Sequence, residues 1–272
     1  MKGLWGSSIA ALLVGVSSGA FAADLRAPPA PVAPIYNWNG FYLGFNFGGA
    51  VPHGTLTNDL FVGNAFTSTS FSTNNDLGLV GGGQVGYNWQ VSPNFVLGVE
   101  GMFDGARFDD NADLVILPSA TRAIAATANT NWIATATGRI GITGGSLGNI
   151  LGSTLTNNTL FYAKGGGAWV NTDASVTDLV RSGGPGTVFV PQASFSASNT
   201  RSGWVAGAGI EYGVLPNFTV RVEYDHIGLG SLTRSGTVVV NNVVISDTLT
   251  LSRSIDMFTV GANYKFCSWV GC

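Results

Sequence analysis

Residues 41–48 read FYLGFNFG, and large apolar side chains occupy every second position of this stretch. The positions between them hold tyrosine, glycine and asparagine. Because successive side chains of a β-strand point to opposite faces, the stretch predicts a strand with one wholly apolar face and one small or polar face. We expect the apolar face to contact lipid, because the same alternation is typical of strands that cross an outer membrane.

The alternation recurs along the chain in eight segments of about ten residues each, the usual length of a membrane-spanning barrel strand. Long polar stretches separate some segments, whereas tight turns at residues 92–94 and 215–217 separate others. Long loops on one side and short turns on the other are typical of outer-membrane topology. We therefore predict an all-β fold, an eight-stranded antiparallel transmembrane up-and-down β-barrel. The approximate strands are 38–49, 77–90, 95–108, 131–143, 159–171, 202–213, 217–229 and 255–266, and the long loops are 50–76, 109–130, 172–201 and 230–254.

The composition supports a lipid-facing barrel and excludes other classes. Only 10% of the 272 residues are charged, whereas a soluble domain usually has about 25%. Beyond the N-terminal segment, no apolar run reaches the roughly 18 residues that a membrane-spanning helix needs. The net charge of −3 makes nucleic acid an unsuitable partner.

The N-terminus has the features of an export signal. Lys2 is followed by an apolar stretch over residues 9–16 and by Ala20-Phe21-Ala22, which predicts cleavage after Ala22. The chain then divides, in our prediction, into four parts, and export places the barrel in the bacterial outer membrane. These parts are a signal peptide (1–22), a proline-rich periplasmic linker (23–36), the barrel (37–266) and a short C-terminal extension (267–272) that holds both cysteines, Cys267 and Cys272.

Aromatic residues collect near both ends of the predicted strands. Aromatic rings are most stable at the boundary between lipid and water, so two bands predict two interfacial girdles. The alternative is an aromatic stripe in the core of a soluble sandwich, but small and aliphatic residues fill the space between the bands. The girdle residues are Phe41, Trp89, Phe95, Phe218 and Phe266 at one rim and Trp132, Trp169, Trp204 and Phe258 at the other.

Charged side chains fall on the opposite face of the strands. A charge at the lipid-facing midplane would cost about 2–4 kcal/mol, which accounts for this segregation. An eight-stranded barrel is only wide enough inside for side chains, so we expect a polar plug, with a selectivity filter in an open pore as the alternative. Glu211 and Arg221 flank the turn at 215–217, so they should be cross-strand neighbours on the inward face and form a desolvated ion pair. Glu100 and Arg139 lie on adjacent strands. The predicted lumen network is Glu100, Arg139, Lys164, Glu211, Arg221, Glu223 and Lys265.

The residues that could carry chemistry are few. Asp225 and His226 are consecutive in a strand, so their side chains point to opposite faces. His53 falls in the first predicted loop and has no cysteine or carboxylate at metal-binding spacing. An outer-membrane protease or acyltransferase would need a histidine and an acid paired at the outer rim. We therefore predict no enzymatic activity, no cofactor and no metal site.

Several motifs resemble one family. Residues 38–44 (WNGFYLG), the two Pro-Asn-Phe turns, residues 138–141 (GRIG) and residues 260–266 (VGANYKF) resemble the outer-membrane immunogenic, porin-like surface proteins of alphaproteobacteria. The resemblance implies a barrel like the transmembrane part of OmpA-type proteins, antigenic loops and, for some members, haemin binding. Neither histidine matches a haemin motif. Family members usually end at the aromatic residue equivalent to Phe266, which the barrel-assembly machinery reads, whereas this chain continues beyond it.

Together these features predict a barrel with a structural and surface-antigen role and a lumen filled by side chains. Its partners would be outer-membrane lipid and lipopolysaccharide, with the barrel-assembly machinery acting during biogenesis. The alternatives are a small diffusion porin and a surface receptor for haemin or another ligand.

Overall fold

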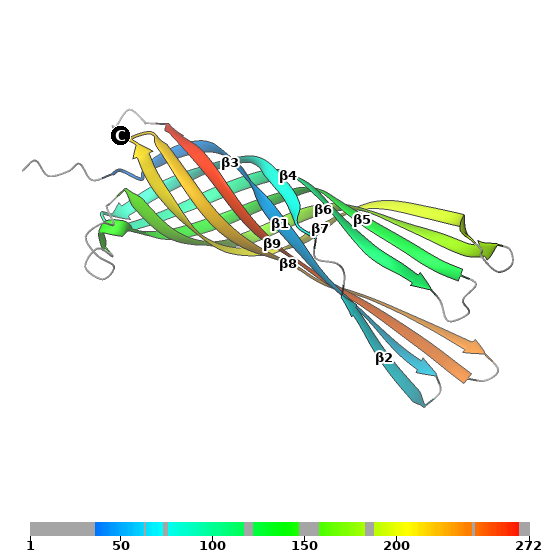
Figure 1. The fold of residues 1–272 in the computed structure, drawn as a ribbon. Coiled ribbons are helices and arrows are strands. Elements are labelled where there is room, and N and C mark those ends of the chain that lie inside the picture. Colours follow the sequence, from blue (N-terminus) through cyan, green and yellow to red (C-terminus); the bar gives the residue numbers. More distant parts are fainter. Residues whose placement is uncertain are drawn as a thin grey trace, which may run out of the picture. The chain divides into compact units, whose positions relative to one another are not determined.

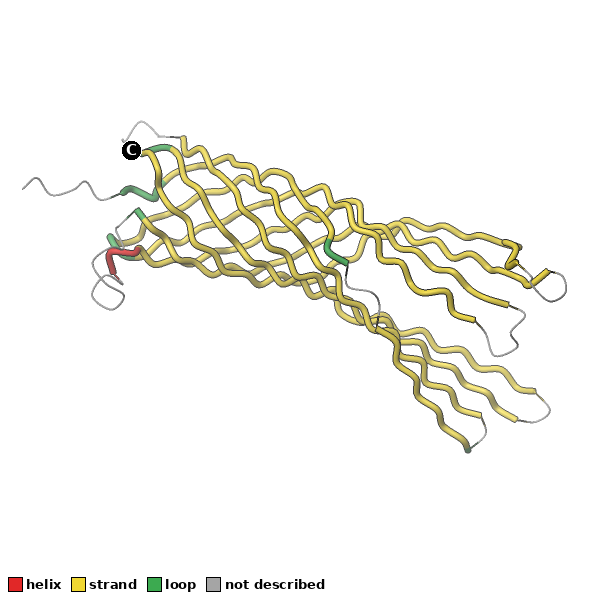
Figure 2. Tube along the Cα trace, viewed as in Figure 1, coloured by secondary structure: helices red, strands yellow, loops and turns green. Residues whose placement is uncertain are grey.

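The computed structural model describes residues 36–62, 64–72, 76–116, 122–146, 158–182, 188–240 and 243–266. The predicted signal peptide, most of the linker and the extension with both cysteines lie outside these ranges. Nearly all described residues belong to β-strands, and a helical turn lies at 144–146 (Figure 2). Among the described residues, no helix has the length and apolar character needed to cross a membrane.

The strands form one antiparallel sheet that closes on itself. Neighbours in the order β2-β1-β3-β4-β5-β6-β7-β8-β9 are paired, and β1 also pairs with β9. β2 pairs only with β1, so the other eight strands make the ring (Figure 1) and the predicted eight-stranded barrel is confirmed. The strands are β1 (Gly40–Val62), β2 (Ala65–Ser72), β3 (Gly78–Ser92), β4 (Phe95–Ile116), β5 (Arg122–Thr143), β6 (Thr159–Ser182), β7 (Val188–Leu215), β8 (Phe218–Val240) and β9 (Val243–Phe266).

The strands are much longer than predicted, and the prediction of four long loops was wrong. Most of residues 50–76, 109–130, 172–201 and 230–254 continue the strands. These stretches are polar, but they are rich in threonine and valine, which suit a pleated sheet, and hydroxyl groups meet across strands, as in the Thr233–Thr250 pair at 3.2 Å. Polarity on both faces was mistaken for loop character.

Beyond the membrane-spanning part the ring divides into two separate sheets (Figure 1). Pairing of β3 with β4 stops at Leu79 and Arg107, and pairing of β7 with β8 stops at Trp204 and Gly228. The extended ends therefore form a β4-β5-β6-β7 sheet and a β2-β1-β9-β8 sheet. At the opposite end the strands stop close to the ring, at the tight turns of residues 93–94 and 216–217, whereas the divided end extends far beyond it. Short connections on one side and long ones on the other are typical of the periplasmic and extracellular ends.

The two faces of the wall follow the predicted alternation. Phe45 points outward with 65% of its surface exposed, whereas the next residue of the strand, Asn46, points inward and is 3% exposed. Outward side chains along the other strands are likewise apolar, including Val99, Ile210 and Val260. The outer surface of the ring is thus suited to lipid.

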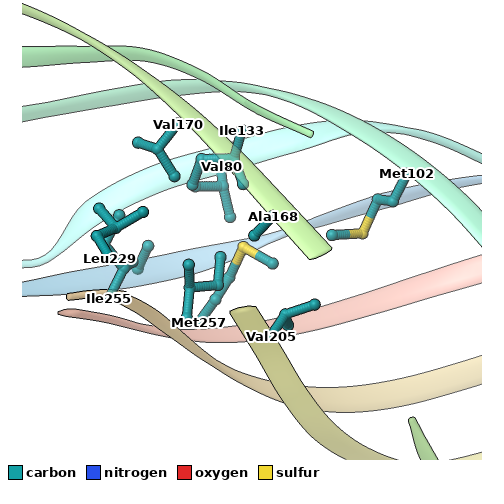
Figure 3. Close-up of a cluster of buried hydrophobic side chains, with 11 residues drawn as sticks. Val80, Met102, Ile133, Ala168, Val170, Val205, Leu229, Ile255 and Met257 are labelled. Carbon is teal, nitrogen blue, oxygen red and sulfur yellow. The ribbon is translucent and has the colours of Figure 1, made fainter. Parts of the chain in front are cut away.

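The lumen contains an apolar layer that the sequence did not predict. Eleven buried residues form this layer near the extracellular end of the ring, and Figure 3 shows their side chains, carried by different strands, directed into one cluster. We predicted a polar plug on this face and no apolar layer. In a closed narrow barrel, however, the inward side chains pack against one another as in a protein core, so apolar residues are as suitable as polar ones. The layer consists of Ala50, Val80, Met102, Ile133, Ala168, Val170, Val205, Ile227, Leu229, Ile255 and Met257.

Candidate functional site in the barrel lumen

Charged side chains meet below the apolar layer, and Glu100 lies at their centre. Its Oε2 accepts hydrogen bonds from Arg221 Nη1 at 2.5 Å and from the hydroxyl of Tyr42 at 2.7 Å. Arg139 Nη1 lies 3.5 Å from the same oxygen, and Lys164 Nζ lies 3.6 Å from Oε1. Three cations therefore surround one buried carboxylate.

Glu211 has a different partner from the one we predicted. The register places it directly opposite Arg221 on the neighbouring strand, but its carboxylate pairs with Arg139 Nη2 at 2.6 Å. It also accepts hydrogen bonds from Thr219 at 2.6 Å and Asn263 at 3.0 Å. The predicted cross-strand position of the two residues is confirmed. The predicted ion pair between them was wrong, because long side chains in a narrow barrel reach across the lumen instead of along the wall.

A third group of contacts surrounds Lys164. Its Nζ lies 2.7 Å from Glu223 Oε1 and 3.0 Å from Asp225 Oδ2. The hydroxyl of Tyr162 donates to Glu223 Oε2 at 2.6 Å. All four side chains are buried. The ion pairs thus join three cations to four carboxylates, which is a net negative charge in a space closed to solvent.

Lys265 lies apart from this network, near the periplasmic end of β9. Its ammonium group donates a hydrogen bond to the carbonyl of Asn37 and lies 4.5 Å from the centre of the Tyr36 ring. Tyr36 packs against Trp38, which is 1% exposed. The segment before β1 therefore forms an aromatic floor inside the barrel, together with Val96, Leu160 and Tyr162. Sequence reasoning missed this floor because Tyr36 and Trp38 precede the alternating part of β1.

The predicted girdle residues lie on the outward wall in two groups. Most of their rings are substantially exposed, and Trp132 and Phe218 are partly buried. At the periplasmic rim, Phe41 packs against Phe266 with ring centres 5.7 Å apart. At the outer rim, Phe103 stacks on Trp132 at 5.6 Å.

A histidine and acid cluster lies above the outer girdle, on the outward face. His226 Nδ1 is 2.6 Å from Asp256 Oδ1, and His53 Nε2 is 2.9 Å from Asp256 Oδ2. The hydroxyl of Tyr224 donates to the same carboxylate at 2.8 Å. Asp225 points into the lumen, as its position in the strand predicts, but the prediction that His53 lies in a loop was wrong. Closure of β1 onto β9 brings His53 beside an acid about 200 residues away in sequence, a contact that no local pattern reveals.

Comparison with known proteins agrees with this architecture. The model of the outer membrane protein beta-barrel domain matches residues 8–266. The chain belongs to this family. It is therefore an integral outer-membrane barrel, and the predicted resemblance and location are confirmed. Two relatives are the 31 kDa outer-membrane immunogenic proteins of Brucella melitensis biotype 1 and Brucella suis biovar 1. Each is 29% identical over an alignment of 278 positions that covers 98% of this chain and 100% of the relative.

Solved structures of other outer-membrane proteins are also similar. The attachment invasion locus protein Ail of Yersinia pestis matches with a TM-score of 0.27 and 12% identity, over 76% of this chain and 98% of that one. Neisserial surface protein A matches with a TM-score of 0.28 and 15% identity, over 80% of this chain and 97% of that one.

Proposed function

We propose that this protein is a non-conducting outer-membrane barrel that carries two β-sheets above the membrane, where they act as surface antigens. The observation that carries the proposal is the filling of the lumen in three layers. An aromatic floor lies at the periplasmic end, a charged network lies above it, and an apolar layer lies toward the outside.

Each layer would oppose the passage of ions in its own way. Trp38 and Tyr36 fill the lower opening with rings. The charged side chains are bound to one another and are 5% exposed or less, so they are not available to hydrate a passing ion. The apolar layer excludes water, and hydrophobic constrictions of this kind close pores by dewetting.

The proposed surface role concerns the extended sheets. They carry the strands beyond the membrane, and their described outward positions are mainly serine and threonine. The Brucella relatives are described as immunogenic proteins, and antigenic display by the extended sheets of this chain would be the equivalent role. The pairs that Asp256 forms with His226 and His53 meet the histidine-and-acid condition that an outer-membrane enzyme would need. Neither proposed role uses these residues in catalysis, so the proposal includes no enzymatic activity.

The test is single-channel recording of the refolded protein in planar lipid bilayers. We expect negligible or rare conductance. Replacing Trp38 and Ile133 together by alanine removes a floor residue and an apolar-layer residue, and should make openings more frequent. A matched control replaces Trp89 and Ile140, which point outward with 46% and 56% of their surfaces exposed, and should leave the conductance unchanged. A steady, large conductance of the unmodified protein would support the competing function, a small diffusion porin.

A further inference from the structure

A hollow of ≈ 400 Å³ lies on the outward wall of the barrel, where β8 and β9 leave the ring. Trp204 and His53 stand at its sides, and hydroxyl groups of Thr55, Ser231 and Ser252 line it. Unlike the apolar grooves lower on the wall, this hollow combines one exposed aromatic ring with several groups that can form hydrogen bonds.

Two glycines create the hollow. A Cβ on Gly228 would overlap the indole ring of Trp204, so only glycine leaves the ring in its place. Gly230 adopts a φ of +65°, a conformation that favours glycine, and the pairing of β8 with β9 shifts register between Gly228 and Ser231. Because the two glycines have no side chains and the backbone is irregular here, the outer surface of the barrel is recessed at this point.

The polar groups beside the hollow are held in fixed positions. Asp256 accepts hydrogen bonds from Tyr224 and from the two histidines, and the His226 ring lies 5.3 Å from the Trp204 ring. Among the described residues, no cluster of histidine, cysteine and carboxylate side chains could hold a metal ion. The contacts of Asp256 thus place hydrogen-bonding groups beside an indole that is 53% exposed.

These features match the chemistry of a sugar ring. The C–H face of a sugar packs against an aromatic ring, and its hydroxyl groups need donors and acceptors at the edge of that ring. Ligand sites in general combine an apolar or aromatic wall with a few fixed polar groups. The hollow has both features, an exposed aromatic ring and fixed polar groups, on one side of the protein.

The position of the hollow identifies the sugar. It lies just outside the outer girdle, on the wall that faces lipid, so the molecules beside it are those of the outer leaflet at the height where lipid gives way to sugar. Farther out on the same face, a ladder of hydroxyl pairs continues between β8 and β9, with Ser235–Thr248 at 3.0 Å and Thr237–Ser246 at 3.2 Å.

We propose that this hollow binds a saccharide unit of the lipopolysaccharide core, and that the sugar chain continues outward along the hydroxyl ladder. The proposal rests on the outer-membrane location and is independent of whether the lumen conducts. A conducting lumen would therefore overturn the proposed function and leave this site intact.

The experiment measures binding by calorimetry to the refolded barrel in detergent. The probes are a lipopolysaccharide that has a core but no long polysaccharide, the soluble core oligosaccharide released from it, and lipid A, which lacks the core. We expect the first two to bind. Replacement of Trp204 by leucine should weaken binding roughly tenfold, the scale of one aromatic contact, whereas Trp169→Leu, at another exposed outer-girdle tryptophan, should have little effect.

A second pair of variants separates binding from folding. Ser252→Trp fills the hollow and should abolish binding. Ala136→Trp, at an exposed outward position of β5 on the opposite side of the ring, should leave binding unchanged. The heat-dependent shift of the folded barrel on gels verifies folding of each variant. Any of three results would overturn the proposal. These are that the core oligosaccharide does not bind, that lipid A binds as tightly as the lipopolysaccharide with a core, or that Trp169→Leu loses as much affinity as Trp204→Leu.

Discussion

Arg221 and Glu100 come from β8 and β4, which are diametrically opposite in the ring of eight strands, and their side chains meet across the lumen at 2.5 Å. The contact ties two walls of the barrel together. It is also the centre of the charged layer, because Glu100 is the carboxylate that all three cations approach.

The first prediction concerns this pair. Removing one partner of a buried ion pair leaves an uncompensated charge and costs about 3–5 kcal/mol. Arg221→Met should therefore lower the free energy of unfolding strongly, and Glu100→Gln combined with Arg221→Met should be less destabilised than the sum of the two single changes. Denaturant unfolding of the refolded barrel in detergent measures all three variants.

A second double-mutant cycle provides the control. Glu211 lies opposite Arg221 in the register but pairs with Arg139. The coupling energy between Glu211 and Arg221 should therefore be smaller than that between Glu100 and Arg221. Equal coupling in the two cycles would mean that the contacts run along the hairpin and not across the lumen.

The second prediction is that Asp104→Asn does not destabilise the barrel and can stabilise it. Asp104 is fully buried, and Oδ1 accepts a hydrogen bond from Asn46 at 2.9 Å. In the described part of the chain no ion pair includes Asp104, so its carboxylate adds to an excess of negative charge. Asparagine keeps the acceptor and removes the buried charge, and the desolvation of one buried ion costs roughly several kcal/mol. The unfolding midpoint of Asp104→Asn should be unchanged or higher than that of the unmodified protein, whereas Glu100→Gln should lower the midpoint.

The third prediction concerns a glycine that makes room for an inward ring. A Cβ on Gly209 would overlap the ring of Tyr162, which donates to Glu223. Gly209→Ala should therefore lower the free energy of unfolding by about 1–3 kcal/mol through overpacking. Gly138→Ala is the control, because a Cβ there meets nothing within 4 Å. Thermal unfolding measures both variants. An equal decrease in their unfolding midpoints would contradict the packing around Tyr162.

The fourth prediction concerns maturation. The apolar stretch and the Ala20-Phe21-Ala22 motif should direct export and cleavage, so the protein purified from outer membranes should begin at Ala23. N-terminal sequencing is the measurement. Recovery in the inner membrane with residues 1–22 still attached would contradict both the cleavage site and the domain boundaries that we propose.

The sequence by itself determined the closed sheet and the assignment of its two faces. Alternation in stretches such as residues 41–48 is a property of the extended backbone, because each side chain points away from its neighbour whatever the rest of the chain does. Lipid tolerates only apolar side chains on one face. The outward position of Phe45 and the inward position of Glu100 were therefore predictable.

The tertiary structure alone decided which inward side chains meet. Arg221 could have paired along its hairpin with Glu211, but closure and strand tilt bring Glu100 from the opposite wall within reach. The same closure brings His53 to Asp256 on the outer wall. Such contacts depend on how the ring closes and on the lengths of side chains from distant strands, and a periodic pattern within one strand contains no information about either.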